Sequence, residues 1–207
     1  MFYEIRTYRL ANGTVPAYLK AVEEEGIAIQ SRHLGTLVAY FHSEIGPLNE
    51  IIHIWGYESG EERTRIRAAA AKDAHWPPKI QEFITRMSSE IVIPFPFAPE
   101  PKPGTYGPFY EFRQYEVRAG TLPEVQKRWE ARLKGRVAVS PITLVGHVEF
   151  GTANRFVHIW PYPSLDARMA TRKKVVADGL WPPTGGAEML LTQASKIVMP
   201  SAFSPMQ

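Results

Sequence analysis

Two matching stretches decide the fold of this chain: residues 2–8 read Phe-Tyr-Glu-Ile-Arg-Thr-Tyr, and residues 109–115 read Phe-Tyr-Glu-Phe-Arg-Gln-Tyr. The match continues downstream, where His-Ile-Trp-Gly-Tyr at residues 53–57 returns as His-Ile-Trp-Pro-Tyr at residues 158–162. The offset is 107 residues at the first stretch and 105 at the second. A unit of about 100 residues is much longer than a solenoid repeat and has the size of a small domain. The chain therefore contains two copies of one folding unit.

A proline-rich stretch, Pro94–Pro108, separates the two copies. Proline lacks a backbone N–H and has a fixed φ, so this stretch cannot continue a central strand or a helix. We expect an extended connector here. We divide the chain into a first repeat (residues 1–99), a linker (100–107) and a second repeat (108–207).

Composition points to an ordinary globular protein. The chain has 207 residues, 44% of them hydrophobic, and a net charge of +3. The densest basic run, Arg172-Lys173-Lys174, falls in an expected helix, so we predict no nucleic-acid partner. The absence of cysteine excludes disulfides and thiolate metal sites. With no apolar run of about 18 residues and no apolar leader, we expect a cytoplasmic protein without a membrane span.

The expected order of elements in each copy is strand, helix, strand, strand, helix, strand. In the first repeat we expect helices from Thr14 to about residue 31 and from Ser59 to Lys72, with a further helical piece to about residue 87. Thr121 and Glu124 have the spacing of a capping box. Strands are expected near residues 2–10, 36–45, 50–58 and 90–97. The sequence therefore predicts an α+β fold of two tandem ferredoxin-like βαββαβ units.

Side-chain alternation divides each sheet into two faces. In the third strand, Ile52 and Ile54 share one face, while His53, Trp55 and Tyr57 share the other. We assign the aliphatic face to the helices. The opposite face should then pack against its counterpart in the other repeat, because burying apolar and aromatic surface contributes about 25 cal/mol per Å². The two sheets would thus enclose the histidine face inside a barrel.

The histidines of the two hairpins are expected to form cross-strand pairs. A tight turn closed by Ile45 and Glu50 would place His42 opposite His53, and the same register would pair His147 with His158. Imidazole and carboxylate groups are ligands for zinc or iron. We expect no metal and no cofactor; if a metal does bind, its ligands would come from His42, Glu44, His53, His147, Glu149 and His158.

The repeated motifs resemble those of the NIPSNAP family. The opening stretch, the His-Ile-Trp-x-Tyr motif, a following arginine (Arg63, Arg168) and an Asp-x-x-Trp motif (residues 73–76 and 178–181) carry the resemblance, in order and in both copies. It implies the dimeric α+β barrel superfamily, with both units in one chain. Related barrels include monooxygenases, isomerases and haem-handling enzymes, and eukaryotic family members are associated with mitochondria and trafficking. The second copy departs from the pattern at Leu180 and residues 184–186.

Three functions remain open. The first is a small-molecule binder or cofactor-independent enzyme for an apolar or aromatic anion in the barrel interior, with His53 and His158 as acid–base candidates. The second is an interaction protein with a packed interior, and the third is a metal or haem site on the histidine pairs. A homodimer or higher oligomer is a further expectation. The predicted binding residues are Arg6, Tyr8, Tyr40, Trp55, Tyr57, Arg113, Tyr115, Trp160 and Tyr162.

Overall fold

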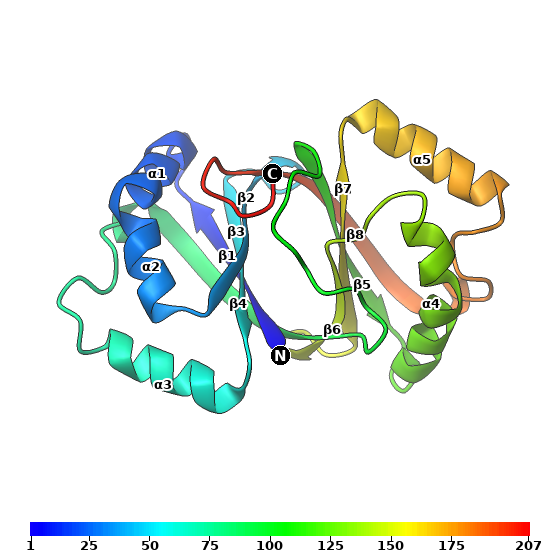
Figure 1. Ribbon diagram of the computed structural model, residues 1–207, viewed down its shortest axis with the longest axis horizontal. Coiled ribbons are helices and arrows are strands. Elements are labelled where there is room, and N and C mark those ends of the chain that lie inside the picture. Colours follow the sequence, from blue (N-terminus) through cyan, green and yellow to red (C-terminus); the bar gives the residue numbers. More distant parts are fainter.

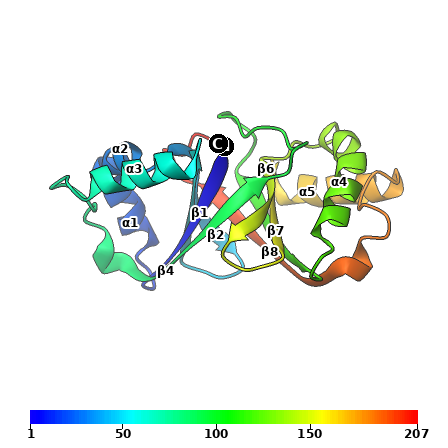
Figure 2. The same ribbon diagram turned by 90° about the horizontal axis from the view of Figure 1, so that it is seen from below.

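Each repeat forms a four-stranded antiparallel sheet, and the two sheets join edge to edge in a closed eight-stranded barrel with the strand order β1-β3-β2-β8-β5-β7-β6-β4. The computed structural model describes residues 1–207. The helices of the two repeats lie on opposite flanks of the strands (Figures 1 and 2). The first repeat contains β1 (Phe2–Leu10), α1 (Val15–Ala21), a π-helical turn (Val22–Gly26), α2 (Ile27–His33), β2 (Thr36–Ile45), β3 (Glu50–Tyr57), α3 (Gly60–Ala70), a 3-10 turn (Gln81–Phe83) and β4 (Ile84–Pro94). The second contains β5 (Phe109–Val117), α4 (Leu122–Val137), β6 (Leu144–Phe150), β7 (Arg155–Tyr162), α5 (Leu165–Ala177), a 3-10 turn (Ala187–Met189) and β8 (Leu190–Pro200).

Two seams close the barrel, and each joins a strand of one repeat to a strand of the other. At the first seam β2 pairs with β8, with Phe41 opposite Pro200. At the second, β4 pairs with β6, with Val92 opposite Val148. Pairing the sheet edges in this way removes unsatisfied backbone groups. The predicted α+β barrel of two ferredoxin-like units within one chain is confirmed.

The grouping of side chains on the two sheet faces is confirmed, but the assignment of those faces was wrong. The aliphatic face, with Ile52 and Ile54, lies in the barrel interior and packs against residues of the other repeat such as Val157 and Ile159. The face with His53 and His158 lies under the helices instead. The physical reason is charge pairing: the buried Glu4 and Glu111 share this face, and their partners Arg63 and Arg168 come from α3 and α5. On the interior face, these strands instead present apolar side chains such as Ile5, Ile54 and Phe112, which cannot pair with a carboxylate.

The hairpin register also differs from the prediction. Tyr40 rather than His42 lies opposite His53, and Val145 rather than His147 lies opposite His158. The strands are offset by two residues from the predicted pairing, which preserves the face of each side chain but separates the histidines. No group of three or more His, Asp or Glu side chains in the chain could hold a metal ion.

The helices follow the predicted order with three local corrections. Ser59 caps α3, accepting a hydrogen bond from the Glu62 N–H at 3.1 Å. Thr121 makes no such cap, because its hydroxyl donates to the Arg118 carbonyl instead. The helical piece expected to about residue 87 is only the short 3-10 turn, and β4 begins at Ile84 rather than near residue 90. No helix has both the length and the apolar character to cross a membrane.

The segment from the start of the first helix to the middle of the second strand is two residues longer in the first repeat than in the second. Tyr40 lies 26 positions after Thr14, whereas Val145 lies 24 positions after Thr121. A π-helical turn adds one residue to a helix, and a β-bulge adds one to a strand. The first repeat has one of each, the π turn after α1 and a bulge between Leu37 and Ala39. Allowing for the π turn, Gln30 is the first repeat's equivalent of Arg136.

Candidate functional site

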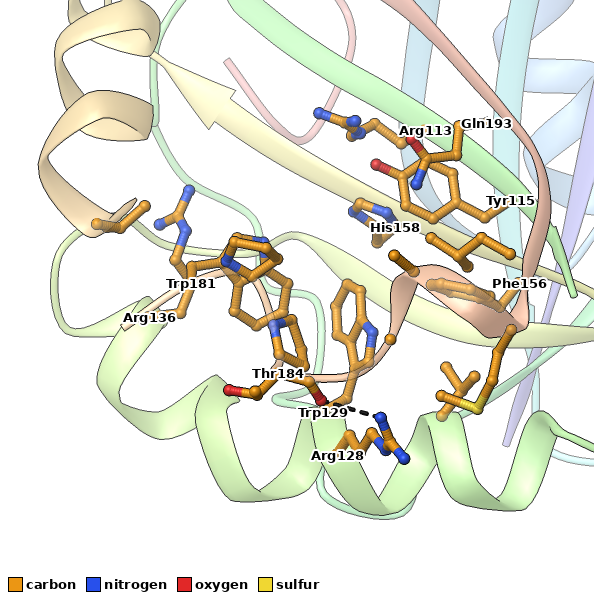
Figure 3. Close-up of a pocket in the computed structure, with 18 of the residues that line it drawn as sticks. Arg113, Tyr115, Arg128, Trp129, Arg136, Phe156, His158, Trp181, Thr184 and Gln193 are labelled. Carbon is orange, nitrogen blue, oxygen red and sulfur yellow. Dashed lines mark hydrogen bonds between the residues drawn. The ribbon is translucent and has the colours of Figure 1, made fainter. Parts of the chain in front are cut away.

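A cavity of about 570 Å³ lies in the second repeat, between the sheet and the helices α4 and α5. Figure 3 shows His158 in its wall between Tyr115 and Trp129, with Arg113 beyond Tyr115 and Arg136 beside Trp181. The volume is within the range of small-molecule sites, about 300–1,000 Å³. Its apolar wall consists mainly of Tyr115, Val125, Trp129, Phe156, Trp160, Val175, Trp181, Met189 and Leu190.

Five of the residues predicted from the sequence line this cavity together. They come from β5 and β7, the first and third strands of the second repeat, and their side chains point to the same side of the sheet. These residues are Arg113, Tyr115, His158, Trp160 and Tyr162. Their counterparts in the first repeat, Arg6, Tyr8, His53, Trp55 and Tyr57, lie on the equivalent face. Tyr40, also a predicted binding residue, lies among those counterparts. His42, Glu44, His147 and Glu149 do not line the cavity.

His158 is held in one tautomer by its neighbour Trp160. The Trp160 indole Nε1–H donates to His158 Nδ1 at 2.6 Å. Since an indole nitrogen is only a donor, Nδ1 must be the acceptor, and the proton of the neutral imidazole is on Nε2. The Nε2 atom is buried and has no hydrogen-bond partner. Burial, together with the charges of Arg113, Arg172 and Arg136, holds the pKa of His158 well below its ordinary value, so the ring is neutral at physiological pH.

Four arginines face the cavity, and one of them is deeply buried without a carboxylate partner. Arg136 is 2% exposed. Its guanidinium donates to the Ser140 carbonyl at 3.3 Å and to the Tyr162 hydroxyl at 3.2 Å, and lies 4.1 Å from the centre of the Trp160 ring. Burial lowers the pKa of Arg136, but a guanidinium remains charged at any physiological pH. The other three arginines are Arg113, Arg128 and Arg172.

A buried carboxylate, Glu111, offsets only part of this charge. Its oxygens lie within 4 Å of Arg113, Arg168 and Arg172. Burial opposes ionisation, but the hydrogen bond from Arg168 and the charges of all three arginines lower the pKa of Glu111 below its ordinary value. One negative and three positive charges leave this cluster cationic, and Arg136 adds to it. The cavity therefore has an apolar body and a positive wall.

The corresponding space in the first repeat is filled. Val125 and Val145 of the second repeat correspond to Tyr18 and Tyr40, which are fully buried. The Tyr40 ring stacks on His53 with the ring centres 4.9 Å apart, and the two tyrosine hydroxyls lie 2.8 Å from each other. His53 accepts a hydrogen bond from Trp55 just as His158 does from Trp160. The hydrogen bond from tryptophan to histidine is thus present in both repeats, but the side chains around the histidine differ: two tyrosines in the first repeat and two valines in the second.

The sequence prediction missed three important residues of the cavity wall. Arg136 continues the buried stripe of α4, after Val125, Trp129 and Leu133. An arginine at this helical spacing within an apolar stripe was a usable signal. Trp129 comes from the same stripe. Trp181, the last residue of the repeated Asp-x-x-Trp motif, also lines the cavity, and its ring centre lies 4.6 Å from that of Trp129.

The segment in which the second copy departs from the repeat pattern also lines the cavity. Residues 182–187 form part of the wall. The Thr184 carbonyl accepts a hydrogen bond from Arg128 at 3.0 Å, marked in Figure 3. The side chain of Arg132, one turn further along α4, donates to the Gly179 carbonyl at 3.1 Å. Two arginines of α4 therefore hold this segment across the cavity.

Comparison with known proteins agrees with the duplicated architecture. The NIPSNAP family model matches residues 3–99 and again residues 110–205. The human protein NipSnap homolog 3A is 28% identical over 216 residues, covering 100% of this chain and 86% of that protein. The Dictyostelium discoideum NipSnap homolog is 28% identical over 190 residues, covering 86% of this chain and 77% of that protein.

The matches among solved structures include proteins that cover nearly the whole chain and shorter proteins that cover about half of it. A Fusobacterium nucleatum protein has a TM-score of 0.68 at 11% identity over 97% of this chain and 92% of that chain, and so shares the fold. A NIPSNAP family protein of unknown function from Agrobacterium tumefaciens is 56% identical, covering 44% of this chain and 85% of that chain, with a TM-score of 0.43. With both repeats matched by the family model, the chain belongs to the NIPSNAP family.

Proposed function

We propose that the second repeat binds a small organic anion with an aromatic or apolar body, in the cavity between its sheet and its helices. One observation carries this proposal: the wall of an apolar cavity contains the buried guanidinium of Arg136, which has no carboxylate partner. The proposed site differs from the sequence expectation in location, because packed apolar side chains, both aliphatic and aromatic, fill the middle of the barrel. It retains the predicted residues of the second repeat.

The anionic group is expected to bind near Arg136. An unpaired buried charge is costly in a low-dielectric environment, and an incoming carboxylate or similar group would offset that cost. A guanidinium can hold a carboxylate through two parallel hydrogen bonds. Arg113 offers a further donor, since its Nε–H is buried and has no partner.

The apolar body is expected to bind among the aromatic rings. Trp129, Trp160 and Trp181 line the cavity with rings at steep angles to one another, including 88° between Trp129 and Trp181. Aromatic ligands gain from both burial and edge-to-face contacts with such rings. A planar ligand therefore fits this wall better than a sugar or another strongly hydrated molecule would.

We propose that His158 donates a hydrogen bond to an oxygen of the ligand rather than accepting its proton. With Nδ1 occupied by Trp160, the free position is the protonated Nε2. A fixed neutral donor in a dry site stabilises negative charge that develops on a carbonyl oxygen. This favours, as a second candidate function, a cofactor-independent enzyme that polarises a carbonyl group of its bound substrate.

Tryptophan fluorescence titration with 2-naphthoate tests the proposal, with 2-naphthamide as the uncharged probe of the same shape. We expect the carboxylate to quench the cavity tryptophans at lower concentration than the amide. His158→Phe should weaken binding, whereas His53→Phe, the matched change in the first repeat, should not, because Tyr40 covers that ring. Equal affinity for acid and amide would refute an anion site, and failure of both probes would favour a partner-binding protein.

A further inference from the structure

Two largely buried ion pairs join the repeats inside the barrel. Lys196 Nζ lies 2.7 Å from Glu50 Oε2, and Arg155 Nη1 lies 2.9 Å from Glu90 Oε1. The four side chains have exposed fractions of only 13% to 21%. Each pair links a carboxylate of the first repeat to a cation of the second. Lys196 and Glu90 lie on the seam strands β8 and β4, next to the last residues that pair across each seam, whereas Glu50 and Arg155 lie on the adjacent strands β3 and β7.

These four residues occupy equivalent positions in the two repeats. Glu50 is the first residue of β3, and Arg155 is the first residue of β7. Glu90 of β4 lies opposite Ile5 of β1. Lys196 of β8 lies opposite Phe112 of β5, which is the counterpart of Ile5 in the second repeat. Both positions are therefore acidic in the first repeat and basic in the second.

We infer that these complementary charges make each repeat specific for the other and exclude barrels built from two like repeats. The repeats have the same strand order, so the edges of two first repeats could pair in the same geometry. Glu50 would then face Glu90 at both seams. In a pair of second repeats Arg155 would face Lys196, with Glu116 of its own repeat, 2.7 Å away, as its remaining carboxylate partner. Placing like charges together in a partly buried interface is strongly unfavourable.

This specificity determines the composition of every barrel. The first repeat has its histidine covered by Tyr40, and the second has the open cavity. Pairing unlike repeats gives each barrel one filled and one open unit, whether the two repeats belong to one chain or are exchanged between two. The partner that fits each seam is thus a sheet edge of opposite charge, and the inference does not depend on what the cavity binds.

Charge exchange in the full-length chain tests the inference, with thermal unfolding and native mass spectrometry as readouts. E50K/E90R makes both repeats basic at the seams, and R155E/K196E makes both acidic. We expect each double variant to unfold at least about 5 °C below the wild type and to lose the wild-type assembly state. The variant with all four substitutions regains opposite charges with exchanged polarity, and should recover most of the lost stability and the wild-type mass.

A surface pair provides the control. Lys174 and Asp178 form an ion pair on α5, with side chains 62% and 41% exposed. Charge reversal of either residue should leave the melting temperature within about 1 °C of the wild type, because exposed pairs contribute little. Double reversals at the seams that behave like this control would overturn the inference. A fourfold variant that is no more stable than the two double variants would also overturn the inference. The loss of stability would then come from disturbing buried side chains and not from placing like charges together.

Discussion

Replacing Arg136 with glutamine should separate ligand binding from stability. Glutamine is the residue at the equivalent position of the first repeat, where Gln30 is also buried. The change removes a buried positive charge and the two hydrogen bonds to Ser140 and Tyr162. Hydrogen bonds from a charged donor contribute roughly 1.5–3 kcal/mol each. Burying the ion costs several kcal/mol.

These opposing contributions are of similar size, so we expect the free energy of unfolding to change by no more than about 1 kcal/mol in either direction. Affinity for the anionic probe should fall much further. Loss of one charged contact of about 2–3 kcal/mol corresponds to a roughly 30- to 150-fold weaker Kd. Affinity for the uncharged amide should barely change.

Urea denaturation and the naphthoate titration measure the two quantities on the same protein. Lys134→Gln is the matched control, because Lys134 is an exposed cation of the same helix and does not line the cavity. A loss of more than about 3 kcal/mol in stability with unchanged naphthoate affinity would refute the reasoning. Arg136 would then be a structural residue that holds α4 to β7.

Three further predictions concern the cavity and its histidine. Introducing tyrosine at both Val125 and Val145 should fill the space as in the first repeat and abolish probe quenching; a titration unchanged by the double substitution would place the probe elsewhere. The pKa values of His53 and His158 are well below the ordinary value, so below pH 6.5 the unfolded chain takes up protons that the native state does not. The free energy of unfolding should therefore fall as pH drops through this range, by up to about 1.4 kcal/mol per pH unit for each histidine. Urea denaturation at several pH values should show a weaker pH dependence of this free energy for the double variant His53→Phe/His158→Phe. Replacing Trp160 with phenylalanine frees Nδ1 of His158, and nitrogen NMR should then show a mixture of tautomers instead of a single Nε2–H form.

A similar dependence at lower pH is expected for Glu4. Burial opposes its ionisation, but hydrogen bonds from Arg63 and Ser89 and the nearby Arg6 lower its pKa to about 2. A carboxylate with a lowered pKa contributes stability that is complete above its unfolded pKa and is lost as the pH falls towards the folded value. Acid unfolding monitored by circular dichroism should be less steep between pH 4 and 2 for Glu4→Gln. An identical acid transition would show that Glu4 is not ionised in the native state.

Duplication and alternation were enough to predict which side chains share a face. The period of two along a strand requires His53, Trp55 and Tyr57 to point the same way, whatever surrounds them. The direction of that face relative to the helices was not determined by alternation. It depends on Arg63 and Arg168, which reach the buried carboxylates from α3 and α5, and strand patterns contain no information about those helices.

By itself, then, the sequence determined two βαββαβ units in one chain and the composition of each sheet face, because both follow from local periodicity and from repetition. Alternation did not determine the hairpin register, because a shift of two residues leaves every side chain on the same face, and the register is shifted by two in both repeats. Only the tertiary structure decided that one repeat is open and the other filled. That difference arises where Val125 of α4 and Val145 of β6 join one buried cluster, in place of Tyr18 and Tyr40 of the first repeat, and no local pattern connects these elements.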